Sequence, residues 1–375
     1  MPEVKQKRKS GKKVMIIIVS VILAIAVIAA AFIEITTIPK DENSDSVIYV
    51  GGMVKSDTVE FKDENSKGLE KNPVVKIMQM IWRFCDGGDK KKHAKQTPPK
   101  NITEIQNIPY IDDGNHYHML DVFYPDSTKD SDRLPVIIDI HGGGWMYADK
   151  DLNDYYCMAL AERGYVVFNL SYRLVPDVTV NEQLQDVALA LQWIKNNISS
   201  YPCDENSIML TGDSAGGQMA VYSAVLMQSP ELRETFGVAD ADMELTALTL
   251  TSPVAFMKSG GAFSVYTKPM WGSDYKNKPT YNYMDLNEII DYASLPPTYL
   301  ITSSGDSLAN KQTHMAYDLL CEKGVKCEMI DVDKKQYGKN LPHVYSVLYP
   351  FEEAGSDAID SALGFYQDAI TSKQQ

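Results

Sequence analysis

The chain has few cysteines and lacks the short motifs that bind metals or nucleotides. Its five cysteines are widely spaced and form no paired CxxC motif, which argues against a zinc site. An odd number of cysteines also argues against a disulfide framework, so buried free thiols are expected. Neither GxGxxG nor GxxxxGK[ST] occurs, which argues against a glycine loop for nucleotide phosphates. We therefore expect no metal and no cofactor.

Positive charge is scarce except at the N-terminus. The formal net charge is -14, and residues 1–33 carry six cations and one acid, which leaves -19 for residues 34–375. An acidic outer portion of this kind argues against nucleic acid or anionic lipid as a partner. The charge indicates nothing further about a substrate.

Residues 14–33 contain no charged residue, and Ser20 is their only polar break. Twenty helical residues at about 1.5 Å each would span the roughly 30 Å core of a bilayer. The basic residues within 1–13 predict that this tail is cytoplasmic and that everything after residue 33 is exported. A cleavable signal peptide is the alternative, because Ala29–Ala31 are small, but its apolar core usually has about 7–15 residues. We therefore expect an uncleaved anchor that crosses the cell membrane once.

The rest of the chain divides by composition. Residues 34–73 are polar and predict a linker or stalk of low order. Within residues 74–100, apolar spacing predicts an amphipathic helix over 74–85, a possible cap element, followed by linker from 90. Residues 101–372 then alternate between strand and helix patterns, which predicts an α/β domain with a mostly parallel sheet flanked by helices. Within that domain, the aromatic and weakly periodic segment 255–293 predicts an insertion over the site.

These patterns place the elements as follows. The predicted strands are 118–124, 134–140, 166–170, 207–211, 247–251, 298–302 and 327–332, and the predicted helices are 155–163, 183–197, 310–323 and 357–370.

The stretch Gly212-Asp213-Ser214-Ala215-Gly216 fits the pattern GxSxG. It follows the predicted strand 207–211, and the alanine-containing segment after it predicts a further helix. Small flanking residues let the strand and helix approach closely, so that the serine projects from a sharp turn. An ordinary tight turn is the alternative. The context of strand and helix favours a nucleophilic serine.

A second glycine-rich stretch, His141-Gly142-Gly143-Gly144-Trp145, directly follows the predicted strand 134–140. Glycines expose backbone N–H groups and permit positive φ angles. Acyl transfer needs such donors where negative charge develops on a carbonyl oxygen. The stretch therefore indicates an oxyanion hole, with a flexible loop as the alternative.

A serine nucleophile needs a general base, and only two histidines follow it in the chain. His314 falls inside a predicted helix, whereas His343 falls in the loop after the last predicted strand, so His343 is favoured. The orienting carboxylate is predicted to be Asp306, directly after a strand, with Asp331 and Asp333 as rivals. The order serine, aspartate, histidine is the one expected of an α/β-hydrolase.

Four motifs in order, HGGGW, SYRLVPD, GDSAGG and SGDSL, resemble the hormone-sensitive-lipase-like branch of the α/β-hydrolases. This resemblance implies cofactor-free esterases for short to medium acyl chains, with a cap over the site. It also implies a role for each matched residue: Ser214 as nucleophile, Asp306 as acid, His343 as base, and the N–H groups of Gly142, Gly143 and Ala215 as oxyanion donors. Two positions depart from the family pattern. No further glycine occurs in WMYADKD, and Val344-Tyr345 replaces a small residue and an aromatic.

The sequence thus predicts an extracellular serine carboxylic-ester hydrolase whose partner is a small-molecule or carbohydrate ester, with acetyl esters of extracellular carbohydrate as the substrate hypothesis. A serine peptidase or amidase on the same fold and a non-catalytic adhesion or scaffold protein remain alternatives. The oligomeric state stays open. His116 and His118 have a spacing that could hold a metal, although a solvated turn is favoured.

Overall fold

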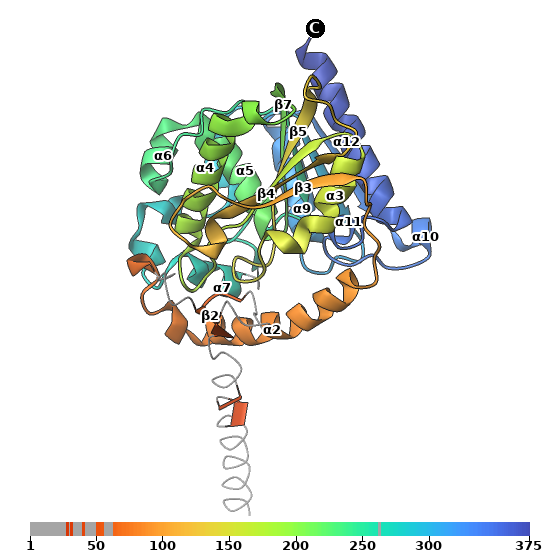
Figure 1. The fold of residues 1–375 in the computed structure, drawn as a ribbon. Helices are drawn as coiled ribbons and strands as arrows, with labels where there is room; N and C mark the ends of the chain where they lie inside the picture. The colour runs from red at the N-terminus through yellow and green to blue at the C-terminus, as the bar shows by residue number, and fades with distance from the viewer. Residues whose placement is uncertain (1–27, 30, 33–39, 42–49, 56–62, 262–263) are drawn as a thin grey trace, which may run out of the picture.

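The computed structural model describes residues 28–29, 31–32, 40–41, 50–55, 63–261 and 264–375 (Figure 1). The expected membrane span 14–33 lies almost entirely outside these residues. Within the described part of the chain, no helix is both long enough and apolar enough to cross a bilayer.

A central sheet of eight strands organises the domain, in the order β10-β9-β8-β7-β5-β6-β4-β3. Strand β4 pairs antiparallel with both β3 and β6, and the remaining neighbours are parallel. The predicted mostly parallel sheet is therefore confirmed. The strands are β3 (Ile102–Pro109), β4 (Met119–Pro125), β5 (Leu134–Ile140), β6 (Val166–Leu170), β7 (Cys203–Asp213), β8 (Ala247–Thr251), β9 (Thr298–Ser303) and β10 (Cys327–Val332).

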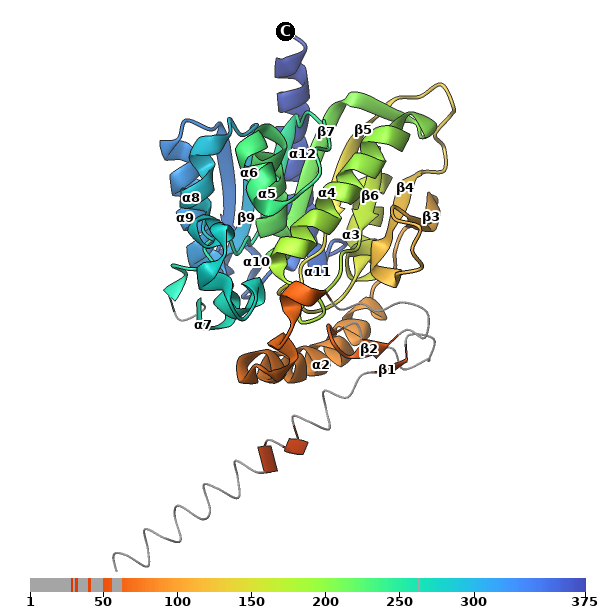
Figure 2. The same ribbon diagram turned by 90° about the vertical axis from the view of Figure 1, so that its left-hand side faces the viewer.

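Helices cover both faces of this sheet (Figures 1 and 2). Along β5 the side chains alternate, so that Ile138 packs with α4 and α5 while Ile137 packs with α3 and α12. This two-sided burial explains why the central strands read as continuous apolar runs. The helices of the domain are α3 (Asp154–Glu162), α4 (Val180–Asn197), α5 (Ala215–Gln228), α6 (Pro230–Phe236), α7 (Ser264–Thr267), α8 (Leu286–Ile289), α9 (Asn310–Glu322), α10 (Lys334–Tyr337), α11 (Tyr345–Leu348) and α12 (Glu353–Lys373).

Among the elements that differ from the sequence prediction are β3 and α2 (Pro73–His93). Strand β3 was not expected, because its polar sequence ITEIQNIP and half-exposed pattern are those of an edge strand. Helix α2 was expected to end near residue 85 but continues through two glycines. Ion pairs of Asp86 with Lys90 and of Asp89 with Lys92 join side chains one turn apart along the added part.

Part of the expected stalk packs onto the domain. Val50, Met53 and Leu69 are fully buried, and the amide of Gly51 donates to the carbonyl of Met146 over 2.8 Å. Short 3-10 turns, η1 (Glu64–Ser66) and η2 (Leu69–Lys71), then lead into α2. The few apolar residues of this polar stretch are therefore packed against the domain, which its composition did not predict. Strands β1 (Lys40–Asp41) and β2 (Val54–Lys55) form a small parallel pair.

Helix α2 lies across the end of the molecule opposite the C-terminus (Figures 1 and 2). Its Trp82 lies beside Gly144, just beyond the carboxyl end of β5, so this is the end at which the parallel strands finish. Ligands of open α/β sheets bind at that end.

Candidate active site

Ser214 lies on a sharp turn between β7 and α5. Its backbone has φ 53° and ψ -113°, which is a strained conformation for a residue with a side chain. The turn is held because the Ser214 amide donates to the Thr251 carbonyl over 2.9 Å, while the Val254 amide donates to the Ser214 carbonyl over 3.1 Å. We call residues 212–217 the serine elbow.

The structure brings the three predicted triad residues together. His343 Nε2 lies 2.9 Å from Ser214 Oγ, and His343 Nδ1 lies 2.9 Å from Asp306 Oδ2. A carboxylate can only accept, so Nδ1 carries the hydrogen and Nε2 is left to accept the serine proton. Asp306 follows β9 and His343 lies between α10 and α11, so three separate segments meet at one point.

Asp306 is held in its ionised form. Burial alone would raise the pKa of this carboxyl, but the hydrogen bond and charge of His343 and the amide of Ala309 outweigh burial and lower the pKa. The amides of Leu308 and Ala309 donate to Asp306 Oδ1 over 3.0 and 2.9 Å. The carboxylate is therefore fixed in orientation as well as in charge.

The other candidates for the base and the carboxylate, His314, Asp331 and Asp333, make contacts outside the triad. His314 Nε2 lies 2.8 Å from Asp331 Oδ2, with both side chains partly exposed to solvent. Asp333 caps the start of α10, where its carboxylate accepts from the amide of Lys335. Neither rival carboxylate is hydrogen-bonded to His343.

The glycine loop, residues 141–147, differs from the sequence prediction at Gly142. The Gly142 amide donates to Asp213 Oδ1 over 2.9 Å, so a protein carboxylate already occupies this donor. Within the described residues, the amides of Gly143, Gly144 and Ala215 have no hydrogen-bond acceptor. Unoccupied backbone donors of this kind are what a tetrahedral oxyanion requires.

The loop begins with a histidine that is kept neutral. Burial lowers the pKa of His141 to about 3. Its ring stacks on Tyr172 with centroids 4.2 Å apart and planes 8° apart. The Tyr172 hydroxyl donates to the carbonyls of His141 and Gly142 over 2.7 and 3.0 Å, which fixes the loop from the segment after β6.

A buried polar cluster behind the loop was not predicted from sequence. Asn153 Nδ2 donates to Asp139 Oδ2 over 2.8 Å and to Asp213 Oδ1 over 2.9 Å. Burial, and then the nearby charge of Asp213, raise the pKa of Asp139 well above its ordinary value. Both causes favour the protonated form of Asp139. The sequence feature that could have indicated this cluster is Asp139 itself, the one charged residue in the otherwise apolar strand β5.

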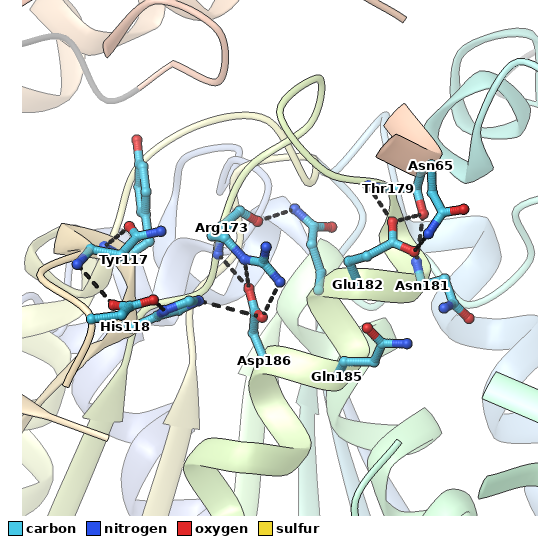
Figure 3. Close-up of polar contacts among 12 residues, drawn as sticks. Asn65, Tyr117, His118, Arg173, Thr179, Asn181, Glu182, Gln185 and Asp186 are labelled. Carbon is cyan, nitrogen blue, oxygen red and sulfur yellow. Dashed lines mark hydrogen bonds and ion pairs between the residues drawn. The ribbon is translucent and has the colours of Figure 1, made fainter. Parts of the chain in front are cut away.

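The SYRLVPD segment supports the loop through an ion-pair network (Figure 3). Arg173 binds both carboxylate oxygens of Asp186, over 2.9 Å from Nε and 2.6 Å from Nη2. Gln183 Nε2 donates over 2.7 Å to the carbonyl of Arg173 and, at the same distance, to that of Trp145 in the glycine loop. Helix α4 thereby ties the two segments to each other.

The expectation of a solvated turn at residues 116–118 is wrong for His118, which is buried. Its Nδ1 lies 2.8 Å from Asp113 and its Nε2 lies 3.5 Å from Asp186, so it belongs to the same network (Figure 3). His116 instead pairs with Asp149 over 3.1 Å. The two imidazoles thus serve different carboxylates and do not share a ligand.

One group of carboxylates in the described chain has the spacing of metal ligands: Asp121, Asp151 and Asp154. The ammonium of Lys150 lies 2.8 Å from both Asp121 and Asp151. A cation of the protein itself therefore already pairs with two of these three carboxylates.

Helix α2 and the insertion cover the glycine loop. Trp82 stacks on Tyr147 with centroids 5.2 Å apart and planes 8° apart. The indole N–H of Trp82 donates to the Tyr266 hydroxyl over 3.4 Å, and that hydroxyl donates to the carbonyl of Gly144. A chain of contacts therefore runs from α2 through α7 to the loop that carries the free amides.

Comparison with known proteins agrees with this geometry. Residues 120–262 match the model of the BD-FAE family. The chain is 26% identical over 295 residues to the probable carboxylic ester hydrolase LipM of Mycobacterium tuberculosis, covering 75% of this chain and 64% of LipM. It is 27% identical over 279 residues to carboxylesterase NlhH of the same species, covering 69% of this chain and 85% of NlhH.

Among solved structures, esterase B from Lactobacillus rhamnosis, crystallised with a C4-C4 tributyrin phosphonate, superposes with a TM-score of 0.76 at 27% identity. The superposition covers 80% of this chain and 97% of that protein. The chain spans less than two thirds of the length of LipM and of two further curated relatives.

Proposed function

We propose, from the premise that this chain is a hormone-sensitive-lipase-like α/β-hydrolase of the esterase type, that it hydrolyses carboxylic esters through an acyl-enzyme on Ser214. The observation that carries the proposal is the relay of two 2.9 Å contacts from Ser214 through His343 to Asp306. That arrangement activates a serine for nucleophilic attack.

In the first half of the reaction, Ser214 Oγ attacks the ester carbonyl carbon while His343 Nε2 takes the hydroxyl proton. Asp306 keeps its negative charge and stabilises the imidazolium that forms. Collapse of the tetrahedral intermediate transfers the proton from Nε2 to the alcohol oxygen and releases the alcohol. The acyl group remains on Ser214 as an ester.

In the second half, His343 takes a proton from water, and the resulting hydroxide attacks the acyl carbon. A second tetrahedral intermediate collapses, Ser214 regains its proton from His343, and the carboxylic acid leaves. Both intermediates place a negative oxygen beside the elbow. The amides of Gly143, Gly144 and Ala215 would stabilise it, each by about 3–4 kcal/mol at most.

For the substrate, we propose esters with short to medium acyl chains, with acetyl esters of extracellular carbohydrate as the specific hypothesis. The C4 phosphonate bound by the related esterase B supports a short acyl chain. The proposed location outside the cell supports a carbohydrate alcohol.

We also propose that residues 14–33 anchor the chain in the cell membrane, with the domain on the outer side. The support is the twenty-residue uncharged stretch behind a basic tail. Treatment of intact cells with protease should remove the domain, and a domain that survives would contradict this orientation.

The test of the activity compares the full chain with Ser214→Ala on p-nitrophenyl acetate. We expect kcat to fall by at least about 10³-fold, because the nucleophile is lost. Equal rates for the two proteins would refute the proposal. Release of acetate from acetylated xylan, measured against aryl acetates, tests the substrate hypothesis separately.

A further inference from the structure

Helix α2 is apolar on two sides. Val75 and Trp82 face the domain, where Val75 is fully buried. On the outer side, Ile77, Ile81 and Phe84 are 42%, 41% and 65% exposed. Their spacing of four and three residues places them on one stripe of the helix. A helix that covers a water-soluble domain usually shows a single apolar face, so the outer stripe needs another explanation.

The charge of α2 also differs from that of the rest of the chain. Within Pro73–His93 there are five lysines and arginines and two aspartates, whereas residues 34–375 as a whole carry -19. Lys90 and Lys91 at its C-terminal end are exposed. The acidity that argues against attraction of the whole protein to anionic lipid is therefore not shared by this helix. Apolar side chains combined with lysines are typical of helices that lie in the plane of a membrane surface.

The outer stripe is also continuous with the expected membrane span. The ring of Phe32, one residue before the end of the span 14–33, stacks on the ring of Phe84 with centroids 6.3 Å apart and planes 16° apart. Phe32 and Ile28 are themselves 46% and 69% exposed. The end of the span and the outer stripe of α2 thus meet, which brings that stripe to the level of the bilayer surface.

We propose that the outer stripe of α2, formed by Ile77, Ile81 and Phe84, lies in the interfacial layer of a lipid bilayer. The catalytic end of the domain, which α2 covers (Figures 1 and 2), then faces the membrane. The enzyme there reaches esters dissolved in the membrane surface in addition to the water-soluble esters proposed above. The inference rests on the proposed ester hydrolysis for its substrate class and on the proposed anchor for its geometry. A second copy of the chain covering the stripe is the competing arrangement.

Photolabelling tests the contact without any assay of activity. The full chain is reconstituted in phosphatidylcholine vesicles that contain a lipid with a diazirine in its acyl chain, and the labelled peptides are mapped after irradiation. We expect label within residues 77–84 as well as within 14–33. The peptide that contains Ile105, a comparably exposed isoleucine on β3, should stay unlabelled.

The outcomes separate the proposals. Label within 14–33 but not within 77–84 would overturn the interfacial helix and leave the anchor intact. A chain labelled in neither segment would contradict the anchor as well. An unlabelled segment 77–84, together with a dimer of the full chain in analytical ultracentrifugation that Phe84→Ser dissociates, would show that a second copy covers the stripe. None of these results depends on hydrolysis, so a failure of the proposed activity is recognised independently.

A second experiment tests the consequence for the substrate. The variant Ile77→Ser/Ile81→Ser/Phe84→Ser is compared with Ile105→Ser on p-nitrophenyl decanoate dissolved in vesicles and on p-nitrophenyl acetate in water. We expect the triple variant to lose about tenfold on the vesicle substrate and less than about twofold on the soluble one. Equal losses on both substrates, or no loss on either, would contradict the proposal. Ile105→Ser should leave both rates unchanged.

Discussion

The two glycine-rich turns of the catalytic end are held in different ways. In the serine elbow, a side chain at Gly216 would collide with the backbone carbonyl of Ile140. In the glycine loop, a side chain at Gly144 would instead meet the side chains of Trp82 and Tyr266. Backbone is hard to move and side chains can turn aside. At Gly216 the elbow is therefore confined by the sheet itself, whereas at Gly144 the loop is confined by side chains of α2 and α7.

The largest expected effect is the difference in stability between an alanine variant of the elbow and an alanine variant of the loop. Gly216→Ala should destabilise the fold by more than about 3 kcal/mol and abolish activity, because β5 and α5 cannot separate without breaking the core. Gly144→Ala should fold with a loss of about 1–2 kcal/mol, the cost of alanine at a positive φ. Urea unfolding of the two variants measures the difference. Similar losses of unfolding free energy at both positions would show that the two turns are held in the same way.

A fall in pH should lower the free energy of unfolding through His141. Its pKa is about 3 in the folded protein, so between pH 3 and about 6.5 the unfolded chain binds a proton that the folded chain does not. Stability from this group is thus complete above about pH 6.5 and lost as the pH falls, by roughly 3 kcal/mol at pH 4.

The control is His141→Asn, which keeps a donor but does not titrate. Unfolding free energies of both proteins between pH 7 and 4 isolate the contribution of the histidine. Asp139, whose pKa is raised, contributes with the opposite sign in both proteins and cancels in the comparison. Parallel pH profiles for the two proteins would show that His141 is not held neutral.

One side chain connects the two turns. Asp213 belongs to the elbow and accepts from the Gly142 amide of the loop and from Asn153. Asp213→Ala should lower kcat by about 30-fold with little change in KM, since loss of this tether costs about 2 kcal/mol of loop positioning. Asp213→Asn keeps an acceptor oxygen and should stay within about threefold of the parent. Equal losses in both variants would mean that charge and not tethering matters.

The smallest effect concerns the contact from the insertion to the loop. Tyr266→Phe removes the hydroxyl that donates to the Gly144 carbonyl and should lower kcat by about fivefold, or about 1 kcal/mol. Tyr292→Phe, at an exposed tyrosine of the same insertion, is the matched control. A fall in KM and kcat together, or an equal fall in the control, would argue against a positioning role.

The elbow could be predicted from sequence because its determinants are local. A strand, a helix and the pattern GxSxG specify where Ser214 lies, and the carboxyl end of β9 places Asp306 beside it. Strands β5, β6 and β8 matched their predicted bounds, since burial on both faces gives continuous apolar runs. The edge strand β10 also matched its predicted bounds, although it is only partly buried.

The loop could not be predicted to the same depth. The Gly142 amide of HGGG is occupied by Asp213, which lies 71 residues away in the sequence. The loop is also held by Trp82 and Tyr266, and nothing in the sequence pattern of their segments indicates that they contact each other beside the loop. The length of α2 was missed because two glycines interrupt its pattern, while one ion pair that spans them and one that follows them support the helix.

The central claim is that Ser214 is a nucleophile activated by His343 and Asp306. The most direct measurement is reaction of the full chain with a fluorophosphonate, followed by mass spectrometry of the digested protein. We predict a single stoichiometric adduct on Ser214 that His343→Ala slows by at least about 10³-fold and Ser214→Ala abolishes. An adduct on another residue, or none on the folded parent protein, would contradict the account.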